Sequence, residues 1–274
     1  GAMYIQTQGI FDLDVLKRFL EMVDKAGIKD AKRSGAVEVA KILHKMGLGT
    51  KVEFFSSYLS TDANGNEIRV FLDDNGVEQR AYSGVYRKSD GTIRIDLEAY
   101  NGRGLTLNAL SHELTHFIQQ WSAEKYQVLA DFLIKSYEKT DMTMHERVLK
   151  EQARLEKIRG KEVSYDEAFD EVVANAMSKM FDDGKLVEKL TELRAEDESL
   201  ARKLWEGFKK IMSKFLGIYE NESALFKDAA DLVEMKETFE QLQNMFAEAL
   251  VEASENHQAS QQIGLKIDTQ TESV

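Results

Sequence analysis

The chain contains no cysteine and no proline among its 274 residues. Without cysteine there are no disulfides, no cysteine-ligated zinc sites and no cysteine nucleophile. Without proline nothing interrupts a helix covalently, so long helices are expected. The sequence also lacks a signal peptide and any run of ~20 apolar residues of the kind that spans a membrane. These absences favour a cytoplasmic protein with no membrane segment.

Positive charge is also scarce, and the formal net charge is -12 with a pI of about 5.1. The basic residues are interspersed with acidic ones, so we do not expect the chain to bind nucleic acid. Its length and its 43% hydrophobic content suffice for one large domain or two small ones. The opening Gly1-Ala2-Met3 resembles the remnant of a removed tag, so we expect a piece of a longer protein.

The first hundred residues predict two helices followed by a small sheet. Apolar residues at helical spacing indicate helices over 11–27 and 35–47. Ile93, Ile95 and Leu97 then alternate with charged residues, which is the period of a strand with one buried face. We predict a mostly antiparallel sheet of about four strands, joined mainly by hairpins, over residues 51–59, 67–72, 81–87 and 92–98.

From Leu105 onward the pattern is helical almost to the end, so the predicted fold class is α+β. The charged run 144–162 is expected to be a solvated helix face. The polar, aperiodic stretch 257–274 is expected to be a tail or an interdomain linker. The predicted organisation is a domain over 4–184, a helical subdomain over 185–256 and that tail. The predicted helices of this half are 105–121, 124–138, 144–158, 164–182, 186–217 and 223–253.

One motif could carry chemistry: His112-Glu113-Leu114-Thr115-His116, an HExxH pattern on an amphipathic helix. Residues four apart share a helix face, so the two histidines can hold one metal ion. Glu113 points about 100° away around the axis, where it can take a proton from a water at the metal. The alternative is an ordinary helix with two histidines near the core. The preceding period-two strand and the bulky apolar residues that follow favour the metal site.

With this motif the chain resembles the zincin metallopeptidases. The third histidine of metzincins is absent from residues 117–122, so the resemblance is to gluzincins, in which a Glu on a later helix completes the zinc site. It implies a zincin-like catalytic domain over 4–184, with a small sheet packed on the HExxH helix, a bound Zn²⁺ and peptide-bond hydrolysis. The phrases SHELTHFIQQWSAEKY and DEVVANAM are similar to zincin-like domains embedded in large multidomain proteins of phages and bacterial mobile elements.

The resemblance places the third zinc ligand in the segment 165–177, where Glu171 lies beside an apolar helix face. Gluzincins often carry an Asp four residues after this Glu, which hydrogen-bonds a ligand histidine. Asn175 occupies that position here and can accept such a bond through its amide oxygen. Glu167 and Asp170 remain open as alternative ligands, and His145 is a more distant one.

The expected function is therefore that of a zinc metallopeptidase acting on a peptide or protein substrate. His112, His116 and Glu171 would hold the zinc, and Glu113 would act as general base. The strand at 92–98 could be the sheet edge along which an extended substrate adds. The alternatives are a catalytically degenerate zincin that serves as a binding or scaffold module, and a different metal-dependent hydrolase. The sequence specifies neither the substrate nor the oligomeric state.

Overall fold

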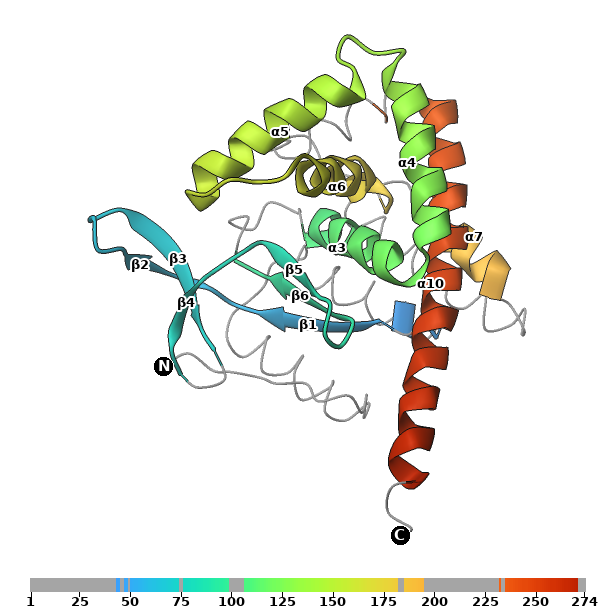
Figure 1. The fold of residues 1–274 in the computed structure, drawn as a ribbon, viewed down its shortest axis with the longest axis horizontal. Helices are drawn as coiled ribbons and strands as arrows, with labels where there is room; N and C mark the ends of the chain where they lie inside the picture. The colour runs from blue at the N-terminus through green and yellow to red at the C-terminus, as the bar shows by residue number, and fades with distance from the viewer. Residues whose placement is uncertain are drawn as a thin grey trace.

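The computed structural model describes residues 43–44, 47–48, 50–73, 76–98, 106–181, 185–194, 232 and 235–270 (Figure 1). The predicted helix 11–27, most of 35–47 and the predicted helical residues 195–217 lie outside the described residues. Six strands and several helices are described, and three of the four strand pairings are antiparallel. The predicted α+β class with a small, mostly antiparallel sheet is therefore confirmed.

The described strands form two sheets of three rather than one sheet of about four. The predicted strand 51–59 is interrupted at Ser57, whose N–H and hydroxyl both donate to the buried carboxylate of Asp96, at 3.0 and 2.6 Å. The chain leaves the first sheet at this point. The first sheet has the order β1 (Lys51–Phe55), β6 (Thr92–Asp96), β5 (Gly84–Arg87), and the second has the order β2 (Tyr58–Thr61), β3 (Glu67–Leu72), β4 (Glu78–Arg80).

The predicted role of residues 92–98 as a sheet edge is wrong, because β6 is the central strand of the first sheet. It pairs in parallel with β1 on one side and antiparallel with β5 on the other. The three strands of the second sheet lie in the sequence between β1 and β5. The pairing of β1 with β6 therefore joins segments that are distant in sequence. The two edge strands of the first sheet, among the described strands, are β1 and β5. This difference matters because an extended peptide can add only to a free edge.

Helix α3 (Thr106–Trp121) lies between the first sheet and a layer of helices (Figure 1). It packs against β5 and β6 on one side and against α4, α6, η1 and α10 on others. Its apolar stripe of Leu110, Leu114, Phe117 and Ile118 is buried. The remaining described helices are α4 (Ala123–Tyr137), α5 (Met144–Arg159), α6 (Tyr165–Ala176), η1 (Met177–Lys179), α7 (Lys185–Arg194) and α10 (Lys236–Gln270).

Helix α5 is less solvated than its charge predicted. It begins with a capping box, in which Thr143 and Glu146 satisfy each other's backbone N–H groups. Val148 and Leu155 face the core, and the charged Glu151 is also buried on this side. The face toward α6 is therefore a packed surface, and only the opposite face is exposed.

The long helix α10 continues through Gln270, so the prediction of an aperiodic tail from residue 257 is wrong for most of that stretch. The imidazole of His257 is buried against the indole of Trp121, with ring centroids 4.7 Å apart. The side chain of Gln258 donates to the carbonyl of Gly47 at 2.7 Å. Polar residues thus dock this part of the helix by bonding to backbone oxygens, which a pattern of apolar residues does not reveal. None of the described helices is long and apolar enough to cross a membrane.

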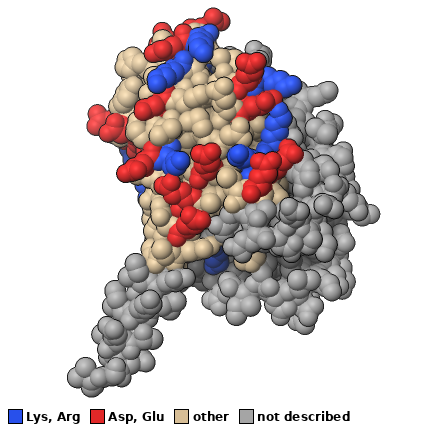
Figure 2. Space-filling model, turned by 90° about the vertical axis from the view of Figure 1, so that its right-hand side faces the viewer, with Lys and Arg blue, Asp and Glu red and all other residues tan. Residues whose placement is uncertain are grey.

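Acidic and basic side chains are interspersed on the face of the molecule that Figure 2 shows. The basic side chains of this face are separated by acidic and neutral ones and do not form a broad positive area. This arrangement matches the mixed order of charges along the sequence.

Substitution of Gly91, in the turn between β5 and β6, tests whether α10 packs against this turn through His257. Gly91 has a φ of 67°, and a Cβ added there would lie 2.8 Å from Nε2 of the buried His257. Gly65 has a φ of 81° but faces open space. Gly65→Ala should cost the backbone strain alone, about 1–2 kcal/mol. Gly91→Ala should cost about 1–3 kcal/mol more, because the ring cannot move aside without disturbing the core.

Urea unfolding of both variants measures this difference, and adding His257→Ala should remove most of it. Equal destabilisation by the two glycine substitutions would show that His257 does not lie against this turn.

Candidate metal centre

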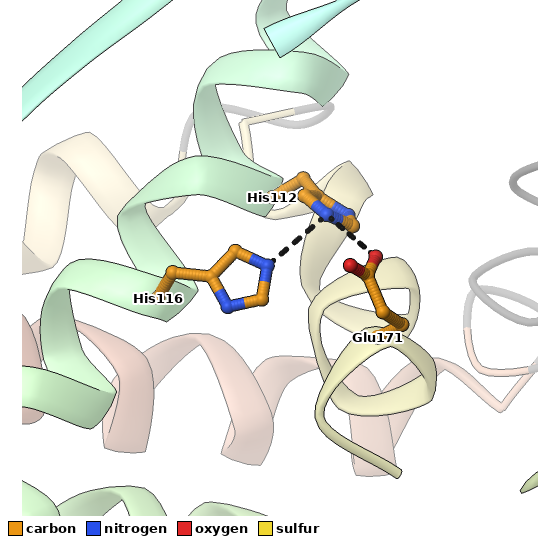
Figure 3. Close-up of side chains that lie close together, drawn as sticks. All are labelled: His112, His116 and Glu171. Atoms are coloured by element: carbon orange, nitrogen blue, oxygen red, sulfur yellow. Dashed lines mark hydrogen bonds and ion pairs between the residues drawn. The ribbon is translucent and has the colours of Figure 1, made fainter. Parts of the chain in front are cut away.

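Three side chains that could hold a metal ion meet between α3 and α6. His112 and His116 project from neighbouring turns of α3 toward Glu171 on α6 (Figure 3). The two Nε2 atoms lie 3.3 Å apart, and Nε2 of His112 lies 3.4 Å from Oε2 of Glu171. The three candidate ligand atoms all lie within 4.8 Å of one another. Among the described residues, this is the group of three or more His, Asp and Glu side chains with such geometry.

Local and long-range packing together create this arrangement. The spacing of four residues places both histidines on one face of α3. Helix α6 packs on that face, and the hydroxyl of Ser111 donates to the carbonyl of Met177, 2.5 Å away, just beyond the end of α6. This contact fixes α6 along α3 and brings Glu171 opposite the histidines.

The alternative ligands have other partners. Glu167 forms an ion pair with Arg159, and its side chain is 48% exposed, whereas that of Glu171 is 20% exposed. Asp170 accepts a hydrogen bond from the hydroxyl of Tyr126 at 2.7 Å. His145, at the start of α5, lies 3.1 Å from the hydroxyl of Tyr165. The structure therefore brings Glu171, and none of these three, into the group of candidate ligands.

The hydrogen bond expected between Asn175 and a ligand histidine is absent from the described structure. Asn175 is buried on α6, one turn beyond Glu171. Nδ1 of His112 is buried and has no hydrogen-bond partner, while the ring of His116 bonds the side chain of Gln119.

Glu113 lies beside the three candidate ligands and points toward β5. Its carboxylate accepts a hydrogen bond from the backbone N–H of Tyr86. The N–H of Asp96 bonds the carbonyl of Ser83, and such bonds recur at every second residue of an antiparallel pair. The backbone groups of Gly84 and Tyr86 therefore face away from β6, along an edge of β5 that pairs with no other described strand and lies next to Glu113.

Gly84 has a role that the sequence did not indicate. A Cβ added at this position would lie 2.8 Å from Oε1 of Glu113 and 3.0 Å from its Cγ. Any larger residue would have to displace the Glu113 side chain. A glycine at the start of a strand is a weak signal, since turns use glycine as often.

Burial and neighbouring charges separate the ionisation of Glu113, His116 and Glu171. Burial raises the pKa of Glu113 to about 7, with a further increase from the charge of Glu171. Burial and the neighbouring His112 lower the pKa of His116 to about 4. Burial opposes the ionisation of Glu171, but the hydrogen bond and charge of His112 outweigh it and lower the pKa of Glu171 to about 2. At neutral pH His116 is therefore uncharged and Glu171 charged, the states in which both can bind a metal.

The donor chemistry of the three groups fits a divalent metal ion. Two imidazole nitrogens and one carboxylate oxygen form a three-ligand set that leaves a coordination position open. Buried Glu113 stands next to this set without belonging to it. The arrangement can therefore combine a metal ion with a proton acceptor whose pKa is near neutral.

Comparison of the chain with protein-family models, with curated proteins and with solved structures found no match. The inference of function therefore rests on the residues and geometry of this site.

Proposed function

We propose that the chain is a zinc-dependent metallopeptidase of the gluzincin type. The observation that carries this proposal is the meeting of both HExxH histidines with Glu171 from a separate helix, with Glu113 beside them. Two imidazoles and one carboxylate are the ligands of several catalytic zinc sites, which keep one position open. The packing of α3 against the first sheet and against α6 supports a zincin-like fold.

His112, His116 and Glu171 would hold the zinc, which when bound would supply the Lewis acidity that activates a water and the scissile carbonyl. Glu113 accepts the proton of the attacking water at its carboxylate. As the C–N bond breaks, it passes that proton to the leaving amine. A carboxyl group whose pKa burial has raised to about 7 can accept and release a proton near neutral pH.

The outer edge of β5, which pairs with no other described strand, lies beside Glu113, and β5 replaces β6 as the docking strand for substrate. An extended peptide that adds to β5 bonds the outward-facing backbone groups of Gly84 and Tyr86 other than the Tyr86 N–H, which bonds Glu113, and passes next to the general base. The absence of a side chain at Gly84 leaves room there for the Glu113 carboxylate. Recognition through the backbone favours a peptide substrate over other hydrolysable groups.

The ligand set is tested by zinc binding. His112→Ala, His116→Ala and Glu171→Ala should each weaken zinc binding by more than the ~10–100-fold typical of losing a residue that only supports a ligand. His145→Ala is the matched control, because His145 bonds Tyr165 outside the group, and it should bind zinc as the wild type does. Competition with a chromophoric chelator measures the affinities. A full equivalent of tightly bound zinc in either α3 histidine variant would place the metal elsewhere.

The general base is tested with Glu113→Gln, which keeps the size of the side chain but removes its basic carboxylate. This variant should bind zinc normally and lose ~10²–10⁴-fold in peptide cleavage. Cleavage of a diverse peptide library, followed by sequencing of the products, supplies the assay. Undiminished cleavage by Glu113→Gln would refute the mechanism. No cleavage by zinc-loaded wild type would favour a binding module.

Gly84→Ala separates the position of Glu113 from its chemistry. The added methyl would meet Oε1 of Glu113 at 2.8 Å, so the carboxylate must move from its place beside β5. We expect zinc affinity to persist and kcat to fall about 10²-fold, the cost of a displacement of about 1 Å in a reacting geometry. Gly65→Ala, which meets no neighbouring atom, should leave kcat unchanged. If Gly84→Ala cleaves peptides as fast as the wild type, this close approach has no catalytic importance.

A further inference from the structure

The two carboxylate oxygens of Glu171 have different partners. Oε2 lies 3.4 Å from Nε2 of His112, on the side of the candidate ligands. Oε1 lies 3.4 Å from Nη2 of Arg159, the last residue of α5. The other terminal nitrogen of this guanidinium, Nη1, bonds the carboxylate of Glu167. Arg159 therefore bridges two carboxylates that lie four residues apart on α6.

The turn between α5 and α6 holds Arg159 in this place. Helix α5 is capped at its C-terminal end by Gly160, which has the left-handed φ of 66° that a glycine adopts without strain. The loop is tied back to α5 by the side chain of Gln152, which donates to the carbonyl of Val163 at 2.7 Å. Ser164 then caps α6 by accepting the N–H of Glu167 at 3.1 Å. The guanidinium thus meets the face of α6 that carries both carboxylates.

The positive charge of Arg159 offsets negative charge next to the candidate metal centre. Glu113 and Glu171 are two carboxylates close enough for the charge of one to oppose ionisation of the other. Arg159 supplies a cation on the side of Glu171 away from the histidines. An arginine suits this task because its planar guanidinium can donate to two carboxylates at once, which a lysine ammonium cannot do with fixed geometry.

We propose that Arg159 is a positioning residue that holds Oε1 of Glu171 and thereby directs Oε2 alone to the metal. This inference rests on the proposed function. Glu167 anchors Arg159 through their ion pair. Glu167, the alternative ligand of the sequence analysis, would thus support the metal site without binding the metal. Without Arg159 the Glu171 carboxylate can rotate, so the metal loses a fixed single-oxygen ligand.

The experiment compares Arg159→Ala with Lys157→Ala. Lys157 is an exposed cation in the same last turn of α5, so its removal changes the net charge equally. Arg159→Ala should weaken zinc binding ~10–100-fold, as loss of a group that orients a ligand does. It should also change the visible absorption of the Co²⁺-substituted protein, which reports the ligand geometry. Lys157→Ala should change neither quantity.

Glu167→Gln tests the anchor. It should weaken zinc binding less than Arg159→Ala does, and it should cause no additional loss when combined with Arg159→Ala, because both act through one contact. A loss with Glu167→Gln as large as that with Glu171→Ala would make Glu167 a ligand and overturn the inference.

The remaining outcomes separate this inference from the function on which it rests. If the wild type binds neither zinc nor Co²⁺, the proposed function fails and the inference fails with it. If the wild type binds both and Arg159→Ala matches it in affinity and spectrum, the inference alone is overturned. Should Arg159→Ala fail to fold, Arg159→Met keeps the aliphatic stem and decides by the same two measurements.

Discussion

The burial of α3 on nearly every side is the constraint on which the rest of the site depends. The helix is enclosed by the first sheet and by four other helical elements, so its polar side chains have little access to water. A buried polar or charged group is costly unless it has a partner. Two of the motif residues, His112 and Glu113, have such partners on other elements. Glu171 comes from α6, and the backbone of Tyr86 comes from β5.

The buried carboxylates of Glu113 and Glu171 lie close together, and their different hydrogen-bond and charge partners give them different pKa values. Glu113 accepts a backbone N–H from β5 and keeps a raised pKa of about 7, because burial opposes its charge. Glu171 is bonded by His112 and Arg159, and its pKa falls to about 2 although burial opposes this. The protein thus places a carboxyl that can exchange a proton next to one that stays charged. This difference in environment is what the proposed roles of Glu113 as general base and Glu171 as metal ligand require.

Strand β5, which lies beside Glu113, is connected to helix α10 through side chains at the end of α3. The indole N–H of Trp121 donates to the hydroxyl of Tyr86 at 2.9 Å, and that hydroxyl donates to Gln120. The indole ring of Trp121 also packs edge-on against the imidazole of His257 on α10. One network therefore connects β5, the end of α3 and α10. The position of β5, and with it the N–H that holds Glu113, depends on a helix far from the site in sequence.

The sequence by itself determined the features that depend on neighbours within one element. The spacing of His112 and His116 is a local property of a helix, and the alternation around Ile93 and Ile95 is a local property of a strand. For the third candidate ligand the sequence indicates only several acidic residues of one helix, Glu171 among them, because a sequence does not show which face packs on α3. The tertiary structure decided the central position of β6, the close approach at Gly84, the missing bond from Asn175 and the bridge by Arg159. Each of these features depends on contacts between segments that are distant in sequence. The packing of whole helices and strands sets the geometry of such contacts, and the hydrophobic period within a single helix or strand does not reveal it.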